Sequence, residues 1–280
     1  MPLSSELFAN AAAAVAAAEA ILITAGAGMG VDSGLPDFRG PEGFWRAYPP
    51  YRTLGLRFEQ LANPAWFARD PELAWGFYGH RLNLYRNTLP HEGFAVLREW
   101  AATRDAFVFT SNVDGHFEKA GFDADRIYAC HGSIHHLQCA RPCCGDIWRA
   151  DGMNVVVDDE TGLAVGGLPI CPSCGGVARP NILMFGDYSF LESRAEDAGR
   201  RYQRWLTSVA GKRVVVIECG AGLAVPTVRM ESERIAKRLS GTLIRINVRD
   251  PDVPAGHVYI PLGAAEAISE IRNNLSLLQG

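Results

Sequence analysis

The chain alternates between short, wholly apolar runs and longer segments in which apolar residues recur with helical spacing. Such short runs are typical of strands buried on both faces of a parallel sheet. They predict strands over residues 20–25, 107–109, 126–129, 181–185, 214–218, 243–248 and 258–262. The segments between them predict helices over 5–19, 92–103, 228–239 and 264–278. We therefore expect an α/β fold, with a Rossmann-like parallel sheet covered by helices on both faces.

Two segments interrupt this alternation and are expected to be insertions. Residues 46–94 are rich in aromatic residues, arginine and proline, which predicts short helices and loops rather than a sheet. Residues 132–180 combine cysteines and glycines with short polar strands. We expect residues 1–45, 95–131 and 181–280 to form the Rossmann-like domain, and the two insertions to form a smaller lobe.

The first strand runs directly into a glycine-rich turn, Gly26-Ala27-Gly28-Met29-Gly30. Glycine has no Cβ, so the backbone N–H groups of such a turn can approach a pyrophosphate, which predicts a dinucleotide site. The segment from Pro36 to Pro41 then forces a loop where an ordinary Rossmann dehydrogenase would continue its helix. The alternative, a glycine-rich turn without a ligand, is disfavoured by the charged turn Asp37-Phe38-Arg39.

Most of the seven cysteines lie close together in the second insertion. Cys171 and Cys174 form a Cys-x-x-Cys knuckle, and Cys139 with Cys143 or Cys144 supplies a second pair. Four thiolates presented by two hairpins predict a closed, structural zinc site, with a chance pair of buried thiols as the alternative. We favour Cys143 over Cys144 because the order Pro142-Cys143 matches a common loop spacing. The two cysteines in or beside apolar strands are expected in the core: Cys130 and Cys219.

Composition excludes several classes of partner. The chain has 280 residues, 48% of them hydrophobic, and can bury a large core. Its net charge of −4 and the lack of a Lys/Arg block argue against nucleic acid and anionic membranes. No apolar run is long enough to span a bilayer, and the alanine-rich first helix lacks the basic start of a secretory signal. We expect a cytoplasmic protein.

These motifs, taken in order, resemble the sirtuin family of NAD-dependent protein deacylases, in its bacterial type, over residues 20–275. The segment from Thr110 to Asp114 is similar to the family's Thr-Gln-Asn-Ile-Asp motif, and His131-Gly132-Ser133 resembles its catalytic histidine and the following turn. The segment from Arg179 to Asp187 resembles the strand that receives the acyl-lysine peptide. Gly220-Ala221-Gly222 resembles the late NAD loop, and Asn247 the strand end that meets the adenosine.

The resemblance implies a role for each of these residues. The acyl oxygen would attack C1′ of the nicotinamide ribose, nicotinamide would leave, and His131 would be the general base on a ribose hydroxyl. Asn112 would orient the ribose or a water, and Asp114 would support the loop. The implied NAD-binding residues are Gly26, Ala27, Gly28, Gly30, Asp37, Phe38, Arg39, Ser111, Asn112, Gly220, Ala221, Gly222, Asn247 and Ala264. The implied peptide-binding residues are Phe185 and Gly186.

Tyr78 and Arg81 give a clue to the acyl group. Some sirtuins that remove acidic acyl groups carry a Tyr-x-x-Arg pair on the helix after the cofactor loop, and this pair fits that spacing. Arginine would bind a distal carboxylate in bidentate fashion. The alternative is a helix face that only packs, with its arginine reaching towards solvent.

Several positions depart from the family pattern and keep other functions open. Ser111 stands in the place of a Gln, Gly30 in the place of a Ser, and Ala221-Gly222 in the place of Thr-Ser. Lost hydroxyl and amide contacts favour, as an alternative, a sirtuin-like ADP-ribosyltransferase or NAD hydrolase. A non-catalytic NAD-binding module is a third possibility, which the presence of His131 and Asn112 opposes. The remaining histidines of the region are expected not to be catalytic, and strand alternation should leave one of His135 and His136 exposed.

Overall fold

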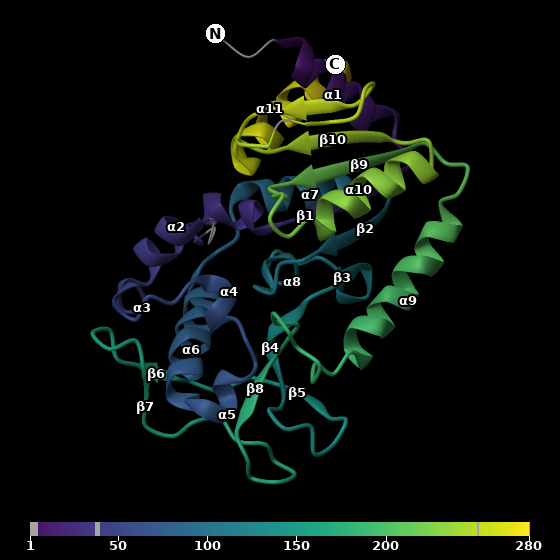
Figure 1. Cartoon of the computed structure of the whole chain (residues 1–280). Coiled ribbons are helices and arrows are strands. Elements are labelled where there is room, and N and C mark those ends of the chain that lie inside the picture. The colour runs from purple at the N-terminus through teal and green to yellow at the C-terminus, as the bar shows by residue number, and fades with distance from the viewer. Residues whose placement is uncertain (1–4, 37–39, 251, 280) are drawn as a thin grey trace.

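A six-stranded, all-parallel sheet forms the larger part of the molecule (Figure 1). The computed structural model describes residues 5–36, 40–250 and 252–279. The strand order is β11-β10-β9-β1-β2-β3. The strands are β1 (Ala20–Ala25), β2 (Asp105–Thr110), β3 (Ile127–Ala129), β9 (Val214–Cys219), β10 (Thr242–Ile246) and β11 (Val258–Ile260). The predicted Rossmann-like sheet is thereby confirmed.

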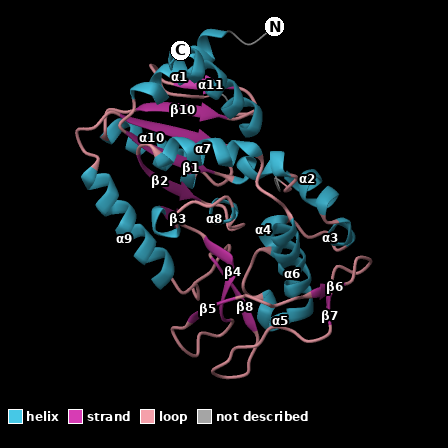
Figure 2. Ribbon diagram, turned by 180° about the vertical axis from the view of Figure 1, so that it is seen from behind, coloured by secondary structure: helices cyan, strands magenta, loops and turns pink. Residues whose placement is uncertain are grey.

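Helices cover both faces of this sheet (Figure 1 and Figure 2). One face is covered by α1 (Ser5–Ala17), α7 (Glu92–Ala102) and α11 (Ala264–Gln279), and the other by α9 (Ser193–Ser208) and α10 (Thr227–Arg238). Successive strand residues point to opposite faces, so Ile21 packs with the first group of helices and Leu22 with the second. Among the described residues, no helix is both long and apolar enough to cross a membrane.

The smaller part of the molecule joins helices of one segment to strands of another (Figure 1). The helices are α2 (Gly40–Ala47), α3 (Pro49–Thr53), α4 (Phe58–Leu61), α5 (Trp66–Arg69) and α6 (Pro71–Asn87). The strands are β4 (Gly132–Cys139), β5 (Ile147–Arg149) and β8 (Ala178–Ile182), which form one sheet, and the hairpin β6 (Val156–Val157) and β7 (Ala164–Val165). Three further short helices follow strands of the parallel sheet: η1 (Ala27–Ser33) after β1, and α8 (His116–Lys119) and η2 (Ala124–Arg126) between β2 and β3.

The structure corrects three local predictions. The segment 46–94 was expected to hold only short helices and loops, but α6 spans 17 residues, because Pro71 opens it and no further proline occurs before Pro90. The strand predicted over 181–185 is β8, which ends at Ile182 and pairs antiparallel with β4 instead of joining the parallel sheet. In β4 an irregularity between Ser133 and Leu137 breaks the alternation, so His135 and His136 are both half-buried.

Candidate active site

A cavity of about 630 Å³ lies where the parallel strands end and the smaller part begins. Segments that follow β1, β2, β3, β9 and β10 form one side, and α4, α6 and the segment after β8 form the other. Ligands of open parallel sheets bind at this carboxyl end of the strands. Twelve of the residues predicted for the site line the cavity: Gly26, Ala27, Tyr78, Arg81, Ser111, Asn112, Asp114, His131, Phe185, Gly220, Ala221 and Gly222.

Five predicted site residues do not line the cavity: Gly28, Gly30, Gly186, Asn247 and Ala264. Gly28 and Asn247 lie directly behind its wall, since the N–H of Gly28 donates to Gly220 O at 3.0 Å and the amide of Asn247 donates to Ala221 O at 2.7 Å. Gly30 is buried against Leu35, and Ala264 is buried at the start of α11. The predicted residues Asp37, Phe38 and Arg39 lie outside the described residues.

The first and late glycine loops form a single wall because they touch through their backbones. Gly220 has a φ of 64°, and a Cβ there would lie 2.3 Å from the carbonyl carbon of Gly28. A Cβ on Gly26 would lie 2.8 Å from Cα of Ala221. Only glycine permits this approach, so the two loops are held together at the ends of β1 and β9.

His131 lies between the two sides of the cavity, between β3 and β4. Its carbonyl oxygen accepts a hydrogen bond from the N–H of Leu183 at 3.0 Å, which ties it to the segment after β8. The next residue, Gly132, has a φ of 80°, and a Cβ there would lie 2.1 Å from Asn181 O. Burial lowers the pKa of His131 below its ordinary 6.5. The imidazole is therefore neutral at pH 7 and able to accept a proton.

Asn112 and Asp114 are fixed by short hydrogen bonds after β2. The side-chain amide of Asn112 donates to Gly26 O at 2.9 Å, and the backbone N–H of Asn112 donates to the hydroxyl oxygen of Thr110 at 3.0 Å. A carboxylate oxygen of Asp114 accepts from the N–H of His116 at 2.9 Å, at the start of α8. Burial raises the pKa of Asp114, partly offset by that bond. These contacts orient both side chains at the cavity wall.

Tyr78 and Arg81 lie together in the cavity wall on α6. Arg81 is only 6% exposed, and its Nε and Nη2 donate to the hydroxyl oxygen of Tyr85 at 3.0 and 2.9 Å. The guanidinium carbon lies 5.2 Å from the ring centre of Phe77 and 5.6 Å from that of Tyr78. Burial raises the pKa of Tyr78 to about 12, so its phenol is a neutral donor at pH 7.

Four cysteines meet at the far end of the small sheet. The Sγ atoms of Cys139, Cys143, Cys171 and Cys174 all lie within 4.8 Å of one another. The pair Cys139–Cys174 is 3.7 Å apart and the pair Cys143–Cys171 is 3.6 Å apart. Four Zn–S bonds in a tetrahedron put sulfurs about 3.8 Å apart, so the cluster suits zinc. Cys144 faces Ser173 outside this set, and none of the four cysteines lines the cavity.

Sequence reasoning missed several residues of the cavity wall. Tyr85 follows Tyr78 and Arg81 at helical spacings of seven and four, a signal that could have identified it. Arg249 and Asp250 also line the cavity, but no local pattern marks them. Of the predicted core cysteines, Cys219 is buried and Cys130 is half-buried.

Comparison with known proteins identifies the family. A family model described as the Sir2 family matches residues 26–205. An NAD-dependent protein deacylase 2 of Pyrobaculum aerophilum is 31% identical over 94% of this chain and 93% of its own length. A mitochondrial NAD-dependent protein deacylase sirtuin-5 of Danio rerio is 32% identical over 61% of this chain and 58% of its own. These relatives do not bear out the expected bacterial type.

A solved structure has the same fold. The crystal structure of a Sir2 homologue in complex with NAD matches 99% of this chain and 95% of its own, with a TM-score of 0.71 and 25% sequence identity. The family model covers more than half of the chain, and the deacylase of Pyrobaculum aerophilum covers nearly all of it. The chain therefore belongs to the Sir2 family.

Proposed function

We propose that this chain is an NAD-dependent protein-lysine deacylase, which transfers the acyl group to ADP-ribose and releases nicotinamide. The observation that carries the proposal is that one cavity collects His131, Asn112, both glycine loops and Phe185. Relatives named as NAD-dependent protein deacylases support the same activity. The second substrate, bound on the side of the cavity that contains Phe185, would be an acylated lysine of a protein or peptide.

The residues of the cavity suit this reaction. NAD supplies the ribose carbon that receives the acyl oxygen as nicotinamide leaves. Neutral His131 then takes the proton of a ribose hydroxyl. Asn112, held by Gly26, orients the ribose or a water, and Asp114 supports the loop. The glycine loops bring backbone groups close to the pyrophosphate.

The four clustered cysteines would hold zinc as a structural ion, since the cluster is closed and lies away from the cavity. Zinc would fix the end of β4 and the start of β8, which pair at Cys139 and Ala178. Clustered thiols of this kind support a reducing compartment, so we propose that the protein acts in the cytoplasm.

We further propose that Arg81 and Tyr78 favour acyl groups that end in a carboxylate. Arg81 lines the cavity, and its charge is held among aromatic rings and the phenol of Tyr85. Desolvation strengthens a guanidinium–carboxylate pair, and the neutral phenol of Tyr78 adds a donor.

The test is nicotinamide release from NAD in the presence of matched acetyl-lysine, succinyl-lysine and unmodified peptides. Release that requires an acyl-lysine supports the deacylase. Nicotinamide release without an acyl-lysine peptide would favour the ADP-ribosyltransferase or NAD hydrolase over the deacylase. No release with any peptide would contradict both activities.

The same assay tests His131. The change His131→Ala should lower deacylation by at least about 100-fold, because a positioned general base contributes that much, while zinc content and melting temperature stay unchanged. His136→Ala is the matched control, since His136 is half-buried outside the cavity. Because the pKa of His131 is lowered, the wild-type rate at saturating substrates should fall with acid only below pH 6.5.

A further inference from the structure

A buried cluster of charges lies behind the late glycine loop. Glu218 of β9 and Arg245 of β10 are register partners, and both side chains are 0% exposed. The Nε and Nη2 of Arg245 donate to the two carboxylate oxygens of Glu218 at 2.5 and 3.0 Å. Glu233 of α10 accepts a further hydrogen bond from Arg245 at 2.8 Å. Burying these charges is costly in free energy, so packing alone does not account for the cluster.

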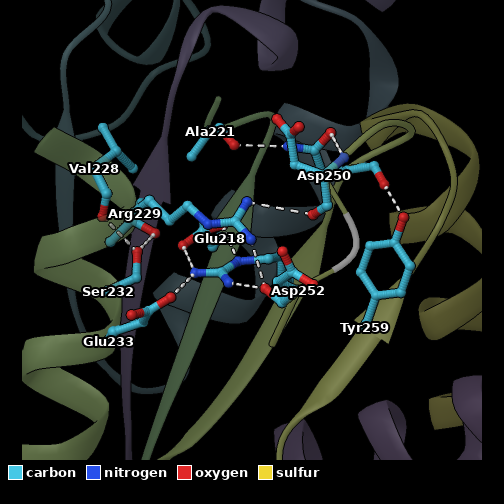
Figure 3. Close-up of polar contacts among 12 residues, drawn as sticks. Glu218, Ala221, Val228, Arg229, Ser232, Glu233, Asp250, Asp252 and Tyr259 are labelled. Carbon is cyan, nitrogen blue, oxygen red and sulfur yellow. Dashed lines mark hydrogen bonds and ion pairs between the residues drawn. The ribbon is translucent and has the colours of Figure 1, made fainter. Parts of the chain in front are cut away.

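The cluster binds the backbone of the segment after β10. Arg245 also donates to the carbonyl oxygen of Asp252. Arg229 of α10, itself 5% exposed, donates to the same oxygen at 2.5 Å and to the carbonyl oxygen of Asp250 at 3.3 Å (Figure 3). Two arginines, of which Arg245 is paired with two carboxylates, thus fix two carbonyl groups of one loop.

That loop is part of the cavity wall. Arg249 and Asp250 line the cavity beside Ala221 and Gly222. Asn247 links this loop to the late glycine loop. Its side-chain amide donates to Ala221 O, and its side-chain oxygen accepts from the backbone N–H of Arg249 at 3.0 Å. Tyr259 donates to the carbonyl oxygen of Asn247 at 2.7 Å (Figure 3).

We propose that Arg229 and Arg245 are positioning residues that hold the adenosine end of the cavity in its binding shape. This inference rests on the proposed NAD-dependent function. Neither arginine lines the cavity, so they act through Asp250, Asp252 and the late glycine loop. A loop that is already ordered loses less conformational entropy when the dinucleotide binds, and affinity rises accordingly.

The first test is Arg229→Met, which removes the two hydrogen bonds that Arg229 donates to the loop. It leaves in place the pair of Glu218 and Arg245 and the bond from Arg245 to Asp252. Calorimetry with ADP-ribose and with NAD should give a Kd raised about tenfold, since charge-assisted hydrogen bonds are lost. The KM for NAD should rise with kcat unchanged, because the lost contacts serve binding in ground and transition state alike. The KM for the acyl-lysine peptide should not change.

Arg104→Met is the matched control. Arg104 also donates to a backbone carbonyl, that of Ala18 at 3.2 Å, but it lies before β2 at the opposite edge of the sheet from the cavity. The Arg104→Met variant should bind ADP-ribose as tightly as the wild type. An equal loss of affinity in both variants would mean a general loss of stability and would overturn the proposal.

The double variant Glu218→Leu, Arg245→Leu separates positioning from stability. Well-packed apolar residues often replace a buried ion pair without loss of stability, but leucine cannot hold Asp252. We expect a near-native melting temperature and a raised Kd for ADP-ribose. If Arg229→Met does not fold, Arg229→Lys keeps the charge and one donor group and should raise the Kd about threefold.

The outcomes are distinct. Folded variants that bind ADP-ribose as tightly as the wild type would overturn the positioning role. A wild-type protein that binds neither NAD nor ADP-ribose would instead overturn the proposed function.

Discussion

At the Tyr78 end, the cavity is lined by two helices, α4 and α6, and the segment after β8, whereas at the Ala221 end it is lined by loops that follow separate strands of the parallel sheet. The arginines near the two ends also differ, in the groups that accept their hydrogen bonds. Arg81 donates to the phenol oxygen of Tyr85, and Arg245 donates to two carboxylates and a backbone carbonyl.

The difference indicates two tasks. The phenol oxygen of Tyr85 accepts from the guanidinium of Arg81 and orients it at the cavity wall, where it can pair with a carboxylate of the acyl group. The carboxylates of Glu218 and Glu233 balance the charge of Arg245, whose donors are used to hold a loop. One end of the cavity would select the acyl group, and the other would shape the site for the dinucleotide.

Removal of zinc should separate the two ends most strongly. The change Cys171→Ser should release the end of β4 and the start of β8, since a structural zinc contributes directly to folding. We expect deacylation to be lost and the small part to become protease-sensitive, while ADP-ribose binding by calorimetry is largely retained. Cys144→Ser is the control and should keep both zinc and activity, because Cys144 lies outside the cluster. If ADP-ribose binding were lost to the same extent as deacylation, the two ends of the cavity would fold as one unit.

The change Arg81→Met comes next in size. It should lower kcat/KM for a succinyl-lysine peptide by about tenfold or more and leave the acetyl-lysine peptide unaffected, because only the former loses a charge-assisted pair. Arg69→Met is the control, since Arg69 also stacks on an aromatic ring, that of Trp66 at 5.2 Å, but lies outside the cavity. An unchanged succinyl-to-acetyl ratio would assign Arg81 to packing alone.

The contrast between the two ends also explains what the sequence could predict. The apolar runs of β1 and β9 and the glycine turns after them are local signals, so the NAD end was predictable in outline. Arg249 and Asp250 were not, because their positions depend on hydrogen bonds with Asn247 and with Arg229 of α10.

The same limit applies to the elements themselves. Helix α9 carries mostly charged and polar residues, and its apolar stripe of Tyr202, Trp205 and Leu206 is too narrow to stand out. Strand β8 was predicted as a strand, but its partner β4 lies about 45 residues earlier in the chain, a distance at which no local pattern applies. The irregularity in β4 that half-buries His135 and His136 arises from that pairing.

The smallest expected effect belongs to Tyr85, and it tests the comparison most directly. Tyr85→Phe keeps the ring against Arg81 but removes the oxygen that accepts from its Nε and Nη2. If the phenol orients the guanidinium, kcat/KM for the succinyl-lysine peptide should fall about threefold, the cost of a modest hydrogen bond, with the acetyl-lysine peptide unchanged. A succinyl preference that is lost in Arg81→Met but intact in Tyr85→Phe would mean that the aromatic rings orient Arg81. The acyl end would then be organised by the packing of aromatic rings on its arginine, whereas the NAD end is organised by the hydrogen bonds and ion pairs of Arg245.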